Sequence, residues 1–344
     1  MAEIHDLIGR IGREQTLQLF DGDDDRRRVE WVASIMGVEN PKRWYLHAGL
    51  CMVALPHSKP KTATAEHVLK NGRFTLILRP APIGTKEGTN EVEYSGLPYG
   101  PKARLILMYM QTYAYRHRTR RVVLGDSMSE WFRRLGLQVT GGGKGTINAV
   151  QEQAQRIARC AFTFIEESAN GKASRVRDQN LVQGLELFAQ DDDDDDAGPQ
   201  QIPLFDGDAP PPKRRRKFNW VREIELTAEF YEHLLDNKVL LREDAIGKLK
   251  GSSWALDAYT WLAYRLRSVD KPTKLRWSLL QEQFGGGPIS NPRMFRPMLT
   301  SALKDALAVY PEADVSIDEE GVTLRPSPPP VTTDFHVMKA IGSR

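Results

Sequence analysis

The chain has 344 residues, a formal net charge of +3 and 40% hydrophobic residues, which is enough apolar material for two or three domains. No run approaches the roughly 20 apolar residues of a membrane helix, and the N-terminus lacks a signal-peptide pattern, so no membrane partner is expected. The two cysteines, Cys51 and Cys160, have no metal-type spacing and favour reduced thiols in a cytoplasmic protein. No cofactor and no metal site are predicted.

The first 28 residues end in a block of opposite charges, DGDDDRRR at 21–28. Such a block is poorly suited to packing, so residues 1–28 are predicted to form a flexible arm. Ordered structure is expected from Val29, with a helix over 29–36. Short apolar or alternating runs at 49–55 and 73–79 are bounded by Pro, Gly and Asn, and they predict strands of a small sheet.

The segment 97–160 contains eleven Lys or Arg and three acidic residues, a local excess of eight positive charges. An excess of this kind indicates phosphate as a partner. The apolar spacing predicts helices over 102–118, 126–134 and 146–159, with a glycine-rich turn at 141–145. Strands at 160–166 and 181–188 are expected to form a hairpin, so the order of elements is that of a winged helix-turn-helix.

A second unit is predicted after a linker. Residues 191–217 hold six consecutive Asp, several Pro and the cluster KRRRK, and they are expected to be a disordered acidic and basic linker. Residues 218–326 predict helices at 228–237, 254–267 and 277–284, a long helix after Asn291-Pro292, and a hairpin of 315–317 with 322–324. The expected fold class is α+β, mainly helical, with tandem winged helix-turn-helix domains at 29–190 and 218–326 and a tail at 327–344.

Several segments carry a family resemblance. LPYG at 97–100, the LGDS…F…RLGL pattern at 124–137 and TGG…G at 140–145 lead into a basic helix, and segments 49–60 and 71–80 add to them. This combination of motifs resembles the plasmid-encoded RepA family of replication initiators from about residue 50 onward. One departure is Trp131, where the family usually has a smaller aromatic residue. The resemblance implies two winged helices, dimers that repress and monomers that initiate. The apolar face of 105–115 is a candidate dimer contact, and the alternative is ordinary core.

Candidate DNA contacts are basic and amide side chains at expected outward positions. Base contacts are expected from Asn148, Gln151 and Gln155 in the first unit and from Arg293, Arg296 and Lys304 in the second. The basic cluster at 213–217 either contacts phosphate or balances Asp191–Asp196, and those aspartates either compete with DNA or serve only solubility. The whole predicted set is Arg116, Arg118, Arg120, Arg121, Lys144, Asn148, Gln151, Gln155, Arg159, Lys213, Arg214, Arg215, Arg216, Lys274, Arg276, Arg293, Arg296 and Lys304.

The string LFDGD occurs twice, within 16–23 and within 201–208. QIPLF in the second copy resembles the bacterial sliding-clamp-binding pentapeptide, and TLQLF in the first matches less well because Thr16 replaces Gln. A few apolar anchors can give such a peptide most of its binding energy. The alternative is that each Leu-Phe pair packs on a domain or occurs by chance. Candidate clamp-binding residues are Leu17, Leu19, Phe20, Gln201, Ile202, Leu204 and Phe205.

Enzymatic interpretations meet specific obstacles. GGGKGT at 141–146 resembles part of a phosphate loop, but Gln138 stands where the first glycine belongs and Gly145 replaces the Ser or Thr after Lys144. Tyr113 and Tyr115 could serve a nicking nuclease, yet the seven histidines never have the spacing of its metal ligands.

The sequence therefore predicts a protein that is not an enzyme. It is expected to initiate plasmid replication by binding double-stranded origin repeats, destabilising the duplex and recruiting host proteins, with the replicative helicase and DnaA as further candidate partners and a homodimer as one state. The alternative is a DNA-binding transcriptional regulator or partition adaptor without initiator activity.

Overall fold

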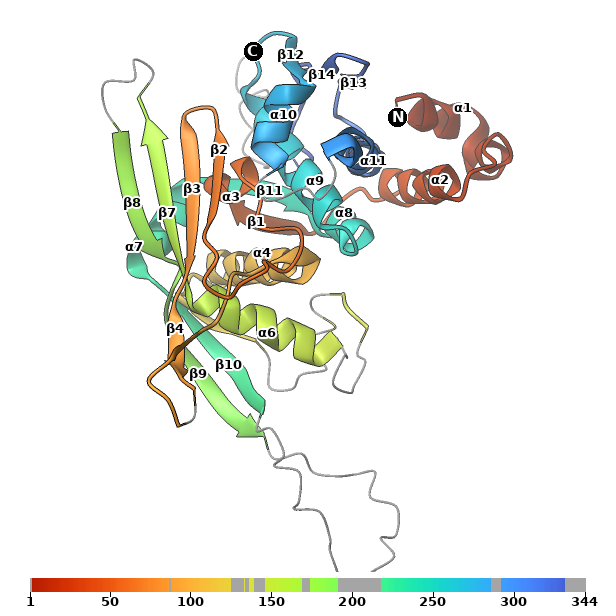
Figure 1. The fold of residues 1–344 in the computed structure, drawn as a ribbon. Coiled ribbons are helices and arrows are strands. Elements are labelled where there is room, and N and C mark those ends of the chain that lie inside the picture. The colour runs from red at the N-terminus through yellow and green to blue at the C-terminus, as the bar shows by residue number, and fades with distance from the viewer. Residues whose placement is uncertain are drawn as a thin grey trace, which may run out of the picture.

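The structure is a computed structural model that describes residues 2–86, 88–124, 133, 136–138, 146–168, 174–190, 218–285 and 292–331. Helices and strands are mixed along the described chain, which confirms the expected α+β class (Figure 1). None of the described helices has the length and apolar character needed to span a bilayer.

Two helices form the N-terminal part, α1 (Ala2–Gln18) and α2 (Asp23–Met36). The prediction of a flexible arm over 1–28 is therefore wrong for residues 2–28. The charge block is helical because its charges pair one turn apart, as in Arg27 with Asp24 and Arg28 with Asp25, and because acids in a first helical turn suit the helix dipole. Arg28 is buried and donates to Asp305 at 2.8 Å, which fixes α2 against α11 (Phe295–Ala308) (Figure 1).

A two-stranded antiparallel pair joins distant parts of the chain. It consists of β1 (Arg43–His47) and β11 (Lys238–Arg242). The short helix α3 (Ala48–Met52) follows β1, so the strand expected at 49–55 is wrong. The His47 side chain caps α3 by accepting a hydrogen bond from the Gly49 amide, a local cap that favours the helical turn.

The largest sheet has four antiparallel strands in the order β2-β3-β7-β8. The strands are β2 (His67–Asn71), β3 (Phe74–Pro80), β7 (Cys160–Glu167) and β8 (Ser174–Asn180), and β4 (Pro82–Thr85) pairs separately with β5 (Val92–Tyr94). Strands expected at 73–79 and 160–166 are confirmed. Leu78 and Phe162 are register partners and both are buried, so the alternating apolar face of β7 is matched by that of β3.

The predicted pairing of 160–166 with 181–188 is wrong. β7 pairs with β8, whereas β9 (Val182–Gln190) pairs with β10 (Phe218–Leu226) across the linker. The short β6 (Arg121–Val123) completes a three-stranded sheet in the order β6-β10-β9. The two strands that pair where a wing hairpin was expected, β9 and β10, are separated in the chain by the 27 residues of 191–217.

Helix α4 (Gly100–His117) crosses the centre of the molecule and confirms the helix predicted at 102–118 (Figure 1). Its side chains are buried on nearly every side, Leu105, Met108 and Tyr109 among them. The face considered for a dimer contact is therefore core of the same chain. Helix α6 (Thr146–Ala158) packs beside α4 and confirms the helix predicted at 146–159, while the helix expected at 126–134 and the turn at 141–145 lie almost wholly outside the described residues.

The C-terminal half contains α7 (Ala228–Asp236), α8 (Glu243–Leu249), α9 (Ser253–Arg265), α10 (Trp277–Phe284) and α11, with 3-10 turns at Leu266–Ser268 and Pro292–Met294. Thr227 caps α7, since its hydroxyl accepts a hydrogen bond from the Phe230 amide. The strands β12 (Thr273–Arg276), β13 (Val315–Ile317) and β14 (Gly321–Leu324) form a sheet in the order β12-β14-β13, which confirms the hairpin predicted at 315–317 and 322–324.

One apolar core spans most of the described chain. Its buried members come from β3, α4, α6, α9 and α11, so both expected units contribute to it. A buried ion pair between Arg104 on α4 and Asp257 on α9 crosses the same boundary. The two units are therefore joined through strands and core, in contrast to the separate tandem domains that the sequence suggested. The linker at 191–217 and the tail beyond 331 lie outside the described residues.

Candidate nucleic-acid interface

Helix α11 presents a basic outer face. Arg296 and Lys304 are exposed and Arg293 is exposed in the turn just before the helix, while Leu299 and Leu303 face the core. The Arg296 guanidinium lies 5.3 Å above the Trp277 ring, which holds it near α10. The three residues expected to contact bases in the second unit are therefore exposed, as their spacing predicted, two of them on α11 and Arg293 in the turn before it. Their contact with DNA stays a prediction.

The neighbouring strand β12 carries two further candidates, Lys274 and Arg276, and both are exposed. The Lys274 ammonium lies 2.6 Å from Glu320 and 3.0 Å from Asp318. These carboxylates raise the pKa of Lys274, and Lys274 in turn lowers the pKa of Asp318. Lys274 is thus less available to a phosphate than Arg276.

On α6 the structure separates the predicted residues. Asn148 and Gln155 are half-buried and Arg159 is exposed, but Gln151 is only 4% exposed, so its predicted role in contacting bases is wrong. The reason is helical spacing, since position 151 lies beside the buried Val150 and Ala154 on the inner face. Lys144 lies outside the described residues.

Much of the basic excess of segment 97–160 is neutralised inside the chain. The sequence count could not reveal this, because three of the four acids involved lie outside that segment. Two of the arginines, Arg104 and Arg156, are buried, whereas Arg120 and Arg121 face acids on β10. The pairs are Arg104–Asp257, Arg120–Glu225, Arg121–Glu223 and Arg156–Glu152.

Arg116 and Arg118 lie at the end of α4, near two residues of β1, Arg43 and Tyr45, for which the sequence predicted no role. Arg116 donates to the backbone carbonyl of Arg43, and Arg118 lies 4.7 Å above the ring of Tyr115. Tyr115 in turn packs on Tyr45, with ring centroids 4.1 Å apart. The alternation of Arg43 and Tyr45 along a strand was the only signal in the sequence that could have pointed to them.

The first LFDGD copy is partly used inside the fold. Leu17 and Phe20 are half-buried and pack against the small cluster of Ile4, Val29, Val32 and Ala308, whereas Leu19 is 60% exposed. Phe20 of the Leu-Phe pair therefore packs on the fold, as the alternative supposed, whereas Leu19 does not. The second copy, with Gln201, Ile202, Leu204 and Phe205, lies outside the described residues, as do Asp191–Asp196 and Lys213, Arg214, Arg215 and Arg216.

The described residues contain no group of three or more His, Cys, Asp or Glu that could hold a metal ion. His47 and His233 approach to 2.6 Å between ring nitrogens, although 186 residues separate them in the sequence. Cys51 and Cys160 are free and buried, and burial raises the pKa of both thiols.

The fold and this surface define a mixed helix-and-strand protein whose C-terminal half has a basic outer face on α11 and a small three-stranded sheet. Residues 97–278 match the family model described as plasmid encoded RepA protein, and this is more than half of the chain. The chain therefore belongs to the plasmid-encoded RepA family, whose members are related to plasmid replication, and the resemblance seen in the sequence is confirmed. No curated protein and no solved structure matches the chain.

Proposed function

We propose that this protein initiates plasmid replication by binding repeated double-stranded sites in an origin through two winged helices. The observation that carries the proposal is the arrangement of the C-terminal half. There, α9, β12, α10, α11, β13 and β14 follow one another, and the last strand lies in the middle of the sheet β12-β14-β13. A winged helix combines a helix-turn-helix with such a small sheet, and the second helix of the helix-turn-helix enters the major groove of DNA. In this proposal that helix is α11, with Arg296 and Lys304 outward and Arg293 exposed in the turn before it.

The N-terminal half supports a second unit of the same kind. The helices α4 and α6 flank β6, and the sheet order β6-β10-β9 again places the last strand in the middle. The strands β7 and β8 are inserted between α6 and β9, where they extend the sheet begun by β2 and β3. The first unit would thus be a winged helix with a larger sheet attached.

In this proposal, neutralised phosphates provide most of the affinity and side chains on α11 and α6 provide base preference. Two linked units raise the effective concentration of each other at paired sites, so the whole chain binds more tightly than either unit. Destabilisation of the neighbouring duplex and recruitment of the sliding clamp through the LFDGD copies complete the proposal. Origin melting and clamp retention separate an initiator from a regulator that only binds DNA.

The test is footprinting of the full chain on DNA that flanks its own gene, at two salt concentrations. Arg296→Ala removes an outward cation from α11 and should cost about 1–3 kcal/mol of discrimination at one base position. Arg267→Ala is the matched control, because Arg267 is also exposed and also lies over an aromatic ring, at 5.5 Å from Tyr264. The control should keep wild-type preference. Absence of salt-sensitive binding to any duplex would refute the proposed function.

A further inference from the structure

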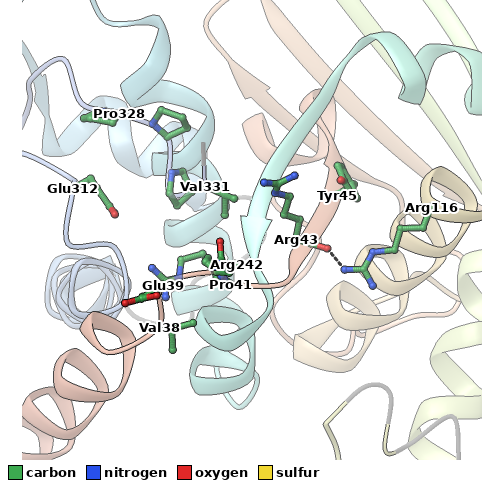
Figure 2. A pocket seen from close by; sticks show the side chains of 13 residues that line it. Val38, Glu39, Pro41, Arg43, Tyr45, Arg116, Arg242, Glu312, Pro328 and Val331 are labelled. Atoms are coloured by element: carbon green, nitrogen blue, oxygen red, sulfur yellow. Dashed lines mark hydrogen bonds between the residues drawn. The ribbon is translucent and has the colours of Figure 1, made fainter. Parts of the chain in front are cut away.

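A groove with a volume of about 470 Å³ lies beside β1, and no residue of α11 is among those that line it (Figure 2). Arg43, Tyr45 and Arg116 form one side of it. Glu39 and Glu312 lie with Arg242 on the other side, next to the proline-rich segment 328–331. The groove is thus basic and aromatic on one side, and on the other side it has two carboxylates beside Arg242.

The outer face of the β1–β11 pair explains the positive wall. Arg43 and Arg242 are direct register partners, and like charges in that position destabilise a sheet unless counter-charges are near. Arg242 has its counter-charge, since it is 5% exposed and binds Asp244 through two nitrogens at 2.8 and 3.0 Å. The Arg116 guanidinium donates to the Arg43 carbonyl, which holds Arg116 beside β1 (Figure 2). Glu243 is the nearby acid, 4.0 Å from Arg116.

Tyr45 is held rigidly in this wall. Its amide donates to the Thr112 hydroxyl at 2.9 Å, and its ring packs on Tyr115, which also lies beneath the cations of Arg118 and Lys238. Burial raises the pKa of the Tyr45 hydroxyl, and the charges of Arg43, Arg116 and Arg118 act in the opposite direction, as expected for cations near that oxygen. A pre-ordered ring loses little conformational entropy when a ligand stacks on it.

An aromatic ring beside several cations is the arrangement by which proteins hold single strands, because bases stack on the ring and phosphates meet the cations. The volume falls in the range of about 300–1,000 Å³ that sites for single small molecules have, so the groove accepts one or two nucleotides but not a duplex. We propose that the groove of Arg43, Tyr45 and Arg116 binds single-stranded DNA. The inference deepens the proposed function, on which it rests, since an opened origin supplies the strand.

The test measures anisotropy of a labelled oligothymidylate, which has no internal base pairing, and of a labelled origin duplex with the full chain. Tyr45→Leu should weaken strand binding by about 5- to 150-fold, while Tyr45→Phe, which keeps the ring, should bind like wild type. Arg116→Gln should lower the slope of log Kd against log salt by about 0.7 for the strand. Tyr45→Leu, at a residue outside the predicted duplex contacts, should leave duplex affinity unchanged.

Arg296→Ala is the reciprocal control, expected to weaken the duplex and spare the strand. If Tyr45→Leu and Arg116→Gln, shown to be folded by thermal unfolding, bind the strand like wild type, the inference is overturned while the proposed function stands. Saturation of the groove by thymidine monophosphate without any binding of the strand would also overturn it, in favour of a free-nucleotide site. Failure of the wild-type chain to bind the origin duplex would instead refute the proposed function.

Discussion

The ion pair between Arg104 on α4 and Asp257 on α9 gives the sharpest stability prediction. Two guanidinium nitrogens of Arg104 each lie 2.6 Å from a different carboxylate oxygen of Asp257. Arg104 also donates to the backbone carbonyls of Leu55 and Gly100, at 2.7 and 2.9 Å, and its side chain is 4% exposed. Asp257→Ala would therefore leave a buried guanidinium without its counter-charge.

Removing one partner of a buried ion pair costs about 3–5 kcal/mol, because the remaining charge stays out of water. With a urea dependence of about 3 kcal/mol per molar, the unfolding midpoint of Asp257→Ala should fall by about 1 to 1.7 M. The double variant Arg104→Met with Asp257→Leu removes both charges and should stay close to wild type, since a well-packed apolar pair often replaces a buried ion pair without loss.

The matched control is Asp314→Ala, which removes a surface pair with Arg325 whose side chains are 63% and 40% exposed. Exposed pairs contribute less than about 1 kcal/mol, so its midpoint should hardly change. Equilibrium urea unfolding, followed by circular dichroism, measures all three variants. Equal midpoints for Asp257→Ala and Asp314→Ala would refute the reasoning, as would a double variant as unstable as Asp257→Ala.

Three further predictions concern buried groups. Burial lowers the pKa of His57 to about 2, so neutral His57 stabilises the fold fully above the ordinary histidine pKa of about 6.5, and this contribution falls by about 1.4 kcal/mol per pH unit as the pH falls toward 2. His57→Gln should therefore lose less stability than wild type between about pH 7 and about pH 5. An equal loss in both proteins would contradict this. Burial raises the pKa of Cys51 and raises that of Cys160 to about 12, so both thiols should react with a disulfide reagent only after unfolding, and fast reaction of the native chain would count against the structure. Arg28→Leu should speed amide hydrogen exchange in α1 and α2 without changing α9, and unchanged exchange would show that the N-terminal helices do not need this ion pair.

Local patterns predicted much of the fold. The helices at 228–237 and 277–284 and the hairpin at 315–317 and 322–324 were visible because apolar spacing and caps act over a few residues. The outward positions of Arg293 and Arg296 followed from the same spacing. The segment 49–55 was misjudged because a short apolar run fits a strand and a buried helical turn equally well.

Predictions that depended on distant partners did less well. Gln151 was expected outside, and Arg104 and Arg156 were counted toward a phosphate-binding surface, but burial removes all three from the surface. Charge counting treats every Lys and Arg as solvent-exposed, whereas a buried guanidinium requires an acid that the chain can supply from any position.

The amino-acid sequence by itself determined the mixed helix-and-strand class, the position of most helices and the membership in the plasmid-encoded RepA family. These depend on the local spacing of apolar residues and on the motifs that the segment 97–278 contains. Only the tertiary structure decided that β9 pairs with β10 instead of β7, that the N-terminal charge block is helical, and that Tyr45 meets Arg116 in one groove. The physical reason is separation along the chain. Arg104 and Asp257 are 153 residues apart and Arg28 and Asp305 are 277 apart, so the energy that fixes them arises only after the chain has brought them together.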